Sequence, residues 1–175
     1  MQEGIVIKST GSWYEVRNEN GEVVLCRLRG KIRLDGIRTT NPVAVGDKVI
    51  FEEENNKDTC VINKILPRNN VIVRKSVNLS KASHIIASNI DQAILVATIA
   101  HPRTSTGFMD RFLVTAEAYH IPTIIVFNKC DLYDDEQMSV AKELISTFEN
   151  IGYHSFMLSA KTGFQCDELK DIMKD

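Results

Sequence analysis

The stretch IIVFNKCDL, residues 124–132, changes character within a few positions. A run of apolar and β-branched residues, typical of a buried strand, leads directly into the polar group Asn-Lys-Cys-Asp at 128–131. A weaker strand-like run, YHSFMLS, ends on Ser-Ala-Lys at 159–161. Because ligands bind at the carboxyl ends of adjacent parallel strands, we expect the two polar groups to form one site.

The residues around these groups predict an α/β domain. Near-continuous apolar runs at 90–100 and 122–128 are typical of parallel strands that are covered on both faces. Helical patterns lie between and after the strands, at about residues 108–116, 135–150 and 166–174. Strands that alternate with helices indicate a parallel sheet.

The first 67 residues have a different rhythm. They contain five short β-branched runs, GIVIKS, SWYEVRN, EVVLCRL, KVIFEEE and CVINKIL, separated by turn signals. One of these signals, Asn20-Gly21, predicts a hairpin with a type I′ turn. The pattern predicts a small β-barrel of the OB or SH3-like kind. We therefore divide the chain into a barrel at 1–67, a linker at 68–89 and an α/β part at 90–175.

Composition and charge limit the classes of protein. The 175 residues are 43% hydrophobic, and no apolar run approaches the roughly 20 residues of a membrane span. Residues 1–75 hold 13 Lys and Arg against 10 Asp and Glu, whereas residues 76–175 hold 8 against 13, which suggests different partners. The four cysteines form no CxxC pair, so we expect no metal site and reduced thiols in a cytoplasmic protein that has no membrane partner.

The two polar groups suit the edge of a guanine base. Guanine presents two neighbouring N–H donors, and the carboxylate of Asp131 can accept both, whereas adenine carries an acceptor at the ring position. The amide of Asn128 can reach N7, and the backbone N–H of Ala160 can donate to O6. Lys129 and Lys161 have methylene stems that can cover the base faces while their charges stay in water.

NKCD followed by SAK resembles the guanine-specificity motifs of the P-loop GTPases. The resemblance implies a guanine site made of Asn128, Lys129, Asp131, Ser159, Ala160 and Lys161. The alternative is that NKCD is only a polar turn after a strand. No GxxxxGK[ST] and no DxxG occur in the chain, so the phosphate-binding motif of these GTPases is missing.

One group of GTPases combines these features. The order of barrel, linker, NKCD and SAK, together with NIDQAILVATIAHP and FMDRFLVTAEAYHIPTIIVFNKCDL, resembles the RsgA/YjeQ family of circularly permuted, small-ribosomal-subunit GTPases. The resemblance implies an N-terminal all-β OB-like barrel and a partial P-loop GTPase sheet in permuted order. We expect the chain to be the N-terminal part of such a protein, with GTP or GDP as ligand and no catalytic residue in this chain. Mg²⁺ and Zn²⁺ are expected only in the complete family protein.

The barrel carries a basic stripe. In CRLRGKIRL, residues 26–34, basic and apolar positions alternate, so the basic side chains share one face of a strand. The expected RNA-binding residues are Arg27, Arg29, Lys31, Arg33 and Arg38. Trp13 and Tyr14 are candidates for base stacking. The alternative is an ordinary solvated strand face, and the resemblance favours docking on small-subunit ribosomal RNA.

Two functions follow from these patterns. The first is a GTPase in late maturation of the small ribosomal subunit, which hydrolyses GTP when the phosphate site is supplied. The alternative is a non-catalytic RNA-binding module whose nucleotide pocket is vestigial. In either case, we expect the strand at 90–99 to have an open apolar edge through which chains can self-associate.

Overall fold

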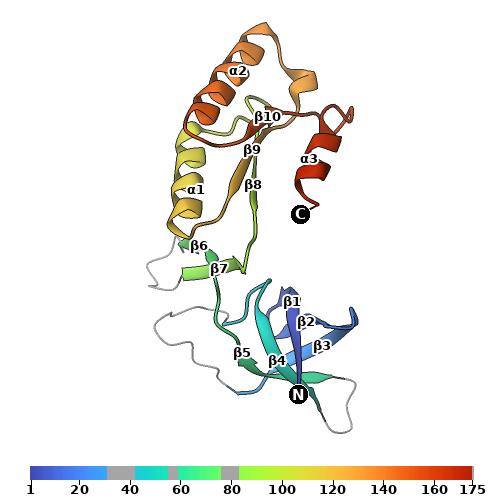
Figure 1. The fold of residues 1–175 in the computed structure, drawn as a ribbon. Coiled ribbons are helices and arrows are strands. Elements are labelled where there is room, and N and C mark those ends of the chain that lie inside the picture. The colour runs from blue at the N-terminus through green and yellow to red at the C-terminus, as the bar shows by residue number, and fades with distance from the viewer. Residues whose placement is uncertain (31–41, 55–58, 76–82, 175) are drawn as a thin grey trace. The chain divides into compact units, whose positions relative to one another are not determined.

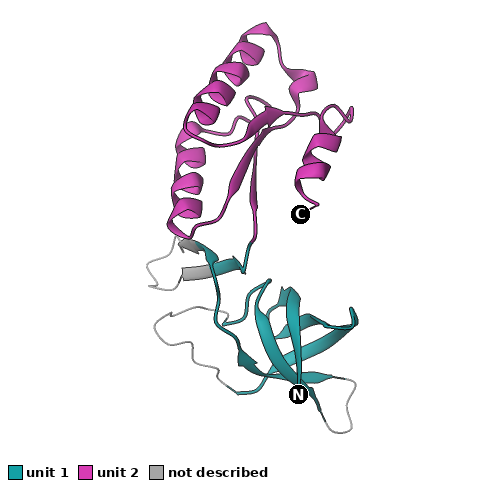
Figure 2. Ribbon diagram, viewed as in Figure 1, with its two compact units in different colours: residues 1–90 teal, residues 91–175 magenta. Residues whose placement is uncertain are grey.

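The computed structural model describes residues 1–30, 42–54, 59–75 and 83–174 (Figure 1). It divides into two compact units, residues 1–90 and residues 91–175 (Figure 2). The first unit contains a barrel and a hairpin, and the second contains a parallel sheet with helices.

The first five strands close into a barrel, as the sequence predicts. They are β1 (Gln2–Thr10), β2 (Trp13–Asn18), β3 (Val23–Leu28), β4 (Lys48–Glu53) and β5 (Cys60–Ile65). Their order around the barrel is β1-β2-β3-β5-β4, with β3 and β5 parallel and the other described pairs antiparallel. Inward-facing side chains such as Val6, Val16 and Phe51 are buried and form one apolar core, which stabilises the barrel through the hydrophobic effect.

The β2–β3 hairpin is confirmed, but the predicted type I′ turn is wrong. Gly21 has a φ of 84°, whereas Asn20 is not among the described residues with positive φ. The N–H of Gly21 donates to Asn18 O at 3.0 Å, and the N–H of Asn18 donates to Glu22 O at 2.9 Å. This is a three-residue loop that ends in a left-handed glycine. The Asn18 side chain stabilises it by accepting from the N–H groups of Asn20 and Glu22.

The segment 68–89, expected to be a linker, carries two strands. β6 (Val71–Lys75) and β7 (Ser83–Ser88) pair antiparallel. The end of β7 reaches the barrel, because Ala87 pairs with Val45 in a parallel bridge. The hairpin therefore belongs to the compact unit of residues 1–90.

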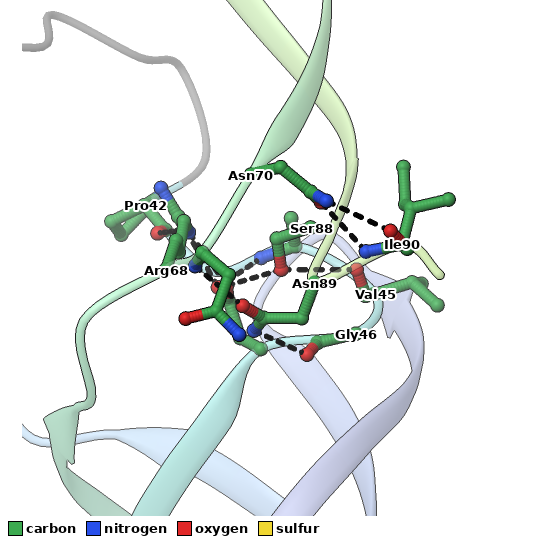
Figure 3. Close-up of polar contacts among 11 residues, drawn as sticks. Pro42, Val45, Gly46, Arg68, Asn70, Ser88, Asn89 and Ile90 are labelled. Carbon is green, nitrogen blue, oxygen red and sulfur yellow. Dashed lines mark hydrogen bonds and ion pairs between the residues drawn. The ribbon is translucent and has the colours of Figure 1, made fainter. Parts of the chain in front are cut away.

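A buried carboxylate joins this hairpin to the barrel (Figure 3). Asp47 is fully buried, and its two oxygens accept from Nε and Nη2 of Arg68, each at 2.6 Å. Its Oδ1 also accepts from the Ser88 hydroxyl at 2.6 Å, and its Oδ2 accepts from the Ala44 N–H at 2.8 Å. A buried charge is tolerated only when it is paired and hydrogen-bonded, and Asp47 meets both conditions.

Gly46 allows the close approach of the two segments. A Cβ at this position would lie 1.9 Å from the carbonyl oxygen of Ser88, and its φ of 89° is one that L-residues rarely adopt. Its own carbonyl accepts from Nδ2 of Asn89 at 2.9 Å. Only glycine both lacks a Cβ and adopts this positive φ readily, so no other residue fits at this position.

The second unit is a three-stranded parallel sheet in the order β10-β9-β8. Its elements are β8 (Ala93–Ala97), α1 (Thr106–Ala118), β9 (Thr123–Phe127), the 3₁₀ turn η1 (Cys130–Leu132), α2 (Asp135–Asn150), β10 (Ser155–Met157) and α3 (Cys166–Ile172). Helices α1 and α2 cover one face of the sheet, and α3 lies on the other face (Figure 1). The predicted α/β class is confirmed.

Strand β9 lies between its two neighbours, and β8 is at the edge of the sheet. Among the described residues, no strand pairs with the outer edge of β8, and Val96 on this strand is 56% exposed. No described helix is both long and apolar enough to cross a membrane.

We predict that Asp47→Asn destabilises the first unit strongly. The substitution leaves the buried Arg68 guanidinium without its counter-charge, and breaking a buried pair in this way costs about 3–5 kcal/mol. The free energy of unfolding, measured by urea denaturation, should fall by that amount. Glu15→Gln removes an exposed pair with Lys8 and serves as the control, with an expected loss of less than about 1 kcal/mol. Equal losses in the two variants would contradict the assignment of Asp47 as the anchor.

Candidate functional site

The candidate site lies at the carboxyl ends of β9 and β10. Residues 128–131 follow β9, and residues 159–161 follow β10 after one intervening residue. Backbone hydrogen bonds join the two segments, because Leu158 N–H donates to Phe127 O at 3.0 Å and Cys130 N–H donates to Leu158 O at 3.2 Å. The structure thus brings together the two polar groups that the strand order predicts to be neighbours.

Asn128 is held by almost all of its polar groups. Its side-chain Oδ1 accepts from the backbone N–H of Lys129 at 2.7 Å and from that of Ala160 at 3.1 Å. Its own N–H donates to Ala97 O on β8 at 2.9 Å. Within the described part of the chain, Nδ2 has no hydrogen-bond acceptor. The amide is therefore fixed in orientation, and its two N–H groups are available to a ligand.

Asp131 is exposed and is oriented from behind by Ser159. The Ser159 side chain is fully buried, and its hydroxyl donates to Asp131 Oδ1 at 2.6 Å. The same hydroxyl oxygen accepts from the Thr162 N–H at 3.2 Å. The residues that the structure describes provide no hydrogen-bond partner for Asp131 Oδ2. One carboxylate oxygen is thus anchored, and the other remains open.

Lys129 adopts a left-handed backbone conformation with a φ of 68°, which is costly for a residue with a side chain. Its ammonium group donates to the backbone carbonyl of His101, which also has a positive φ, of 60°. The loop that carries His101 is closed by Thr98 and Thr104, since Thr104 N–H donates to Thr98 O at 2.8 Å. The charge of Lys129 is therefore directed toward the loop after β8, a contact that the sequence does not predict.

The side chain of Lys161 is exposed beside Ala160. The backbone N–H of Ala160, which the sequence suggests as a donor to a base, is engaged by Asn128 Oδ1 in this structure. All six residues of the predicted site thus belong to the two loops, but Ser159 is buried behind Asp131 and does not line the surface.

Tyr133 is a member of this cluster that the sequence analysis missed. Its hydroxyl donates to the backbone carbonyl of Asn128 at 2.6 Å and accepts from the N–H of Ile99 at 3.0 Å. Burial raises the pKa of the Tyr133 phenol above its usual value, so the phenol stays protonated. An aromatic residue with a polar tip, placed two positions after a site carboxylate, is the signal that could have identified it.

Cys130 occupies the variable position of NKCD. Burial, together with the negative charge of Asp131, raises the pKa of its thiol. A raised pKa lowers the thiolate fraction at neutral pH, and the thiolate is the reactive form. Within the described residues, no group of three His, Cys, Asp or Glu side chains can hold a metal.

The structure describes two of the five candidate RNA-binding residues, Arg27 on β3 and Arg29 just after the end of this strand. Arg27 pairs with Glu54, with Nε 3.1 Å from Oε2, and Arg29 pairs with Glu52 at 2.8 Å. Both arginines remain exposed, by 45% and 65% of their side chains. Lys31, Arg33 and Arg38 lie outside the described residues.

The two aromatic candidates for stacking differ in burial. Trp13 is 42% exposed and lies opposite Arg27 in the β2–β3 pair. Tyr14 is only 2% exposed and belongs to the barrel core, so it is not available to a base. The exposed pair of Trp13 and Arg27 lies on strands β2 and β3, the face that OB-folds use for oligonucleotides.

Two family models together match most of the chain. A model described as RsgA GTPase matches residues 65–175, and one described as RsgA N-terminal domain matches residues 3–61. The small ribosomal subunit biogenesis GTPase RsgA of Bacteroides fragilis is 49% identical over 174 residues, which are 98% of this chain and 55% of that protein. The protein of the same name from Christiangramia forsetii is 53% identical over 173 residues, with the same coverage.

Two solved structures resemble nearly the whole chain. The crystal structure of YjeQ from Thermotoga maritima matches with a TM-score of 0.74 and 36% identity, over 99% of this chain and 57% of that one. The structure of YloQ, described as a circularly permuted GTPase, matches with a TM-score of 0.65 and 34% identity, over 99% and 55%. The chain therefore spans about half the length of the relatives that it matches.

Proposed function

The chain belongs to the RsgA GTPase family, and from this premise we propose that residues 91–175 form the guanine-recognition part of a cytoplasmic GTPase that acts in maturation of the small ribosomal subunit. The observation that carries the proposal is the joint geometry of Asn128 and Asp131. Each side chain is anchored by one oxygen, and each keeps hydrogen-bonding groups free at the same end of the sheet.

Guanine fits this arrangement by donor and acceptor pattern. Asp131 accepts the N1–H and the exocyclic amino group, since the bond from Ser159 leaves Oδ2 and further lone pairs of the carboxylate open. Nδ2 of Asn128 donates to N7. The methylene stems of Lys129 and Lys161 cover the faces of the base. Adenine would oppose a ring lone pair to the carboxylate, and the unpaired charge would penalise its binding.

Ser159 and Ala160 are each hydrogen-bonded to another side chain of the site, so their roles differ from direct contact with the base. Ser159 is a positioning residue for Asp131, because its buried hydroxyl contacts the carboxylate and not the solvent. Ala160 N–H is bonded to Asn128 Oδ1, so the O6 of a bound guanine must share this donor with the amide oxygen. Asn128 and Asp131 are therefore oriented by protein contacts alone.

Hydrolysis requires groups that these 175 residues lack. The phosphate cradle and its Mg²⁺ supply most of the catalysis in phosphoryl transfer. Neither GxxxxGK[ST] nor DxxG occurs in the sequence, and the described residues offer no cluster for Mg²⁺ or Zn²⁺. We therefore assign to this chain only the recognition of the guanine base of GTP and GDP.

The barrel is proposed to contact small-subunit ribosomal RNA through Arg27 and Arg29, with Trp13 as a stacking platform. Exposed ion pairs contribute little, so phosphates can replace Glu54 and Glu52 as partners of the two arginines. Lys31, Arg33 and Arg38 remain part of this proposal on the sequence alone. The alternative, an RNA-binding module with a vestigial nucleotide pocket, explains the barrel but not the pre-oriented Asn128 and Asp131.

Asp131→Asn tests the guanine assignment. In the complete gene product that carries this chain, the affinity for GDP should fall by roughly 5- to 150-fold, because a bidentate base contact is worth about 1–3 kcal/mol. The affinity for xanthosine diphosphate should rise, since xanthine carries an acceptor where guanine carries its amino donor.

Competition titrations against a fluorescent GDP measure both affinities. Asp135→Asn removes a neighbouring exposed carboxylate in the first turn of α2 and is the matched control, with both affinities unchanged. An Asp131→Asn protein that keeps its guanine preference would favour the vestigial pocket.

The RNA proposal predicts opposite effects for the two members of an ion pair. Replacing Arg27 and Arg29 by Ala should weaken binding to purified small subunits and lower the salt slope of the affinity by about 2, because each lost phosphate contact removes roughly 0.9. Glu52→Gln should strengthen binding, since it frees Arg29. Filter binding over a salt series measures both quantities. Arg111→Ala on α1 is the control, and an equal effect there would rule out a specific barrel surface.

The edge of β8 is proposed as a surface for non-native self-association of residues 1–175. An unpaired, partly apolar edge strand is a template for pairing with a second chain. Sedimentation of the purified 175-residue chain should show dimers or larger species, and Val96→Lys should shift the population toward monomer. A monomeric parent chain would exclude this behaviour.

A further inference from the structure

The hydrogen-bond ladder between β8 and β9 is interrupted at the point where the candidate site begins. The strands pair in parallel up to Ala97 and Phe127, and the next bond runs from the Asn128 N–H to Ala97 O. In a regular parallel ladder, the following bond would join the Ile99 N–H directly to the Asn128 carbonyl. In this structure both groups bind the hydroxyl of Tyr133 instead, at 3.0 and 2.6 Å.

We infer that Tyr133 is a positioning residue for base recognition, whose hydroxyl acts as a spacer between the ends of β8 and β9. The inference rests on the proposed guanine site. The spacer fixes the backbone of Asn128 through its carbonyl, while other contacts hold its backbone N–H and its side-chain Oδ1. Nδ2 of Asn128 is then the free donor on an otherwise immobilised residue.

The geometry of the loop supports this role. Tyr133 follows the 3₁₀ turn Cys130–Leu132, and its ring folds back so that the hydroxyl reaches a residue five positions earlier. The hydroxyl therefore closes the loop that carries Lys129 and Asp131. Because the same oxygen accepts from Ile99, it also links this loop to the segment after β8, where the His101 carbonyl receives the Lys129 ammonium.

Removal of the hydroxyl has only two structural outcomes. If β8 and β9 keep their separation, the Ile99 N–H and the Asn128 carbonyl lose their partner. If the strands close to form the direct bond, Asn128 moves toward β8 by about the width of an oxygen atom. In the first case the Asn128 carbonyl loses the bond that fixes it, and in the second case Asn128 is displaced. In both cases Asp131 keeps its contact with Ser159.

The test compares Tyr133→Phe with the parent in the complete gene product, using GDP, 7-deaza-GDP and inosine diphosphate. 7-Deaza-GDP lacks the N7 acceptor for Asn128, and inosine diphosphate lacks the amino group for Asp131. The parent should bind 7-deaza-GDP about fivefold more weakly than GDP, the value of one hydrogen bond. In Tyr133→Phe this ratio should approach one, while the ratio of GDP to inosine diphosphate stays as in the parent.

Ratios of dissociation constants measured on one preparation do not depend on the fraction of folded protein, so they separate positioning from a general loss of stability. Tyr153→Phe is the matched control, because it removes a hydroxyl that donates to Glu117 at 3.1 Å on an exposed surface, and both ratios should be unchanged. Hydrogen exchange of the Ile99 amide separates the two outcomes in Tyr133→Phe, because it becomes faster if the strands keep their separation and stays slow if the direct bond forms.

Three results would overturn the inference. They are a parent that does not distinguish GDP from 7-deaza-GDP, a Tyr133→Phe protein that keeps the parent ratio, and one in which both ratios fall equally. An Asp131→Asn protein with unaltered guanine preference would instead overturn the proposed function, and the inference with it. The two failures are distinguishable because Asp131 binds N1–H and the amino group of the base, whereas Tyr133 acts through Asn128 on N7.

Discussion

The placement of β9 between β8 and β10 is the constraint on which the candidate site depends. All five residues of the strand, Thr123–Phe127, are buried, and both of its edges are hydrogen-bonded to a parallel neighbour. The strand cannot slide without breaking two ladders and exposing apolar surface on both faces of the sheet. Asn128 therefore leaves the sheet at one defined point, and the loop after β10 meets it there.

Two carboxylates show how burial separates structure from recognition. Asp47 is fully buried, and both of its oxygens are satisfied by Arg68, Ser88 and Ala44. Nothing remains for a ligand, so the group stabilises the first unit. Asp131 is exposed, and the one contact described for it, with Ser159, orients it without using up its acceptors. A preorganised binding site requires a side chain that is held in place and still has free hydrogen-bond acceptors.

The sequence predicts those features that depend on local pattern. Apolar runs, alternation and the NKCD and SAK groups are local, so the barrel, the parallel sheet and the meeting of the two loops could be anticipated. The pairing of Asp47 with Arg68 joins residues 21 positions apart and has no local signal, so the sequence predicts a linker where the structure has a hairpin. The bond between Tyr133 and Ile99 spans 34 positions, so no local pattern predicts this partner, although the position of Tyr133 after Asp131 is a local signal for the residue itself. At Asn20-Gly21, the competing bonds of the Asn18 side chain decided the turn.

The hydrogen bonds around Asn128 and Asp131 offer a physical reason why base recognition can be separated from phosphate binding. Every described contact that orients the two side chains comes from the ends of β8, β9 and β10 or from the loops that follow them. None requires a residue of a phosphate-binding loop. A site that is complete in this sense does not depend on whether the phosphate loop precedes or follows it in the chain. Circular permutation changes the order of the two parts and leaves the contacts that orient Asn128 and Asp131 intact.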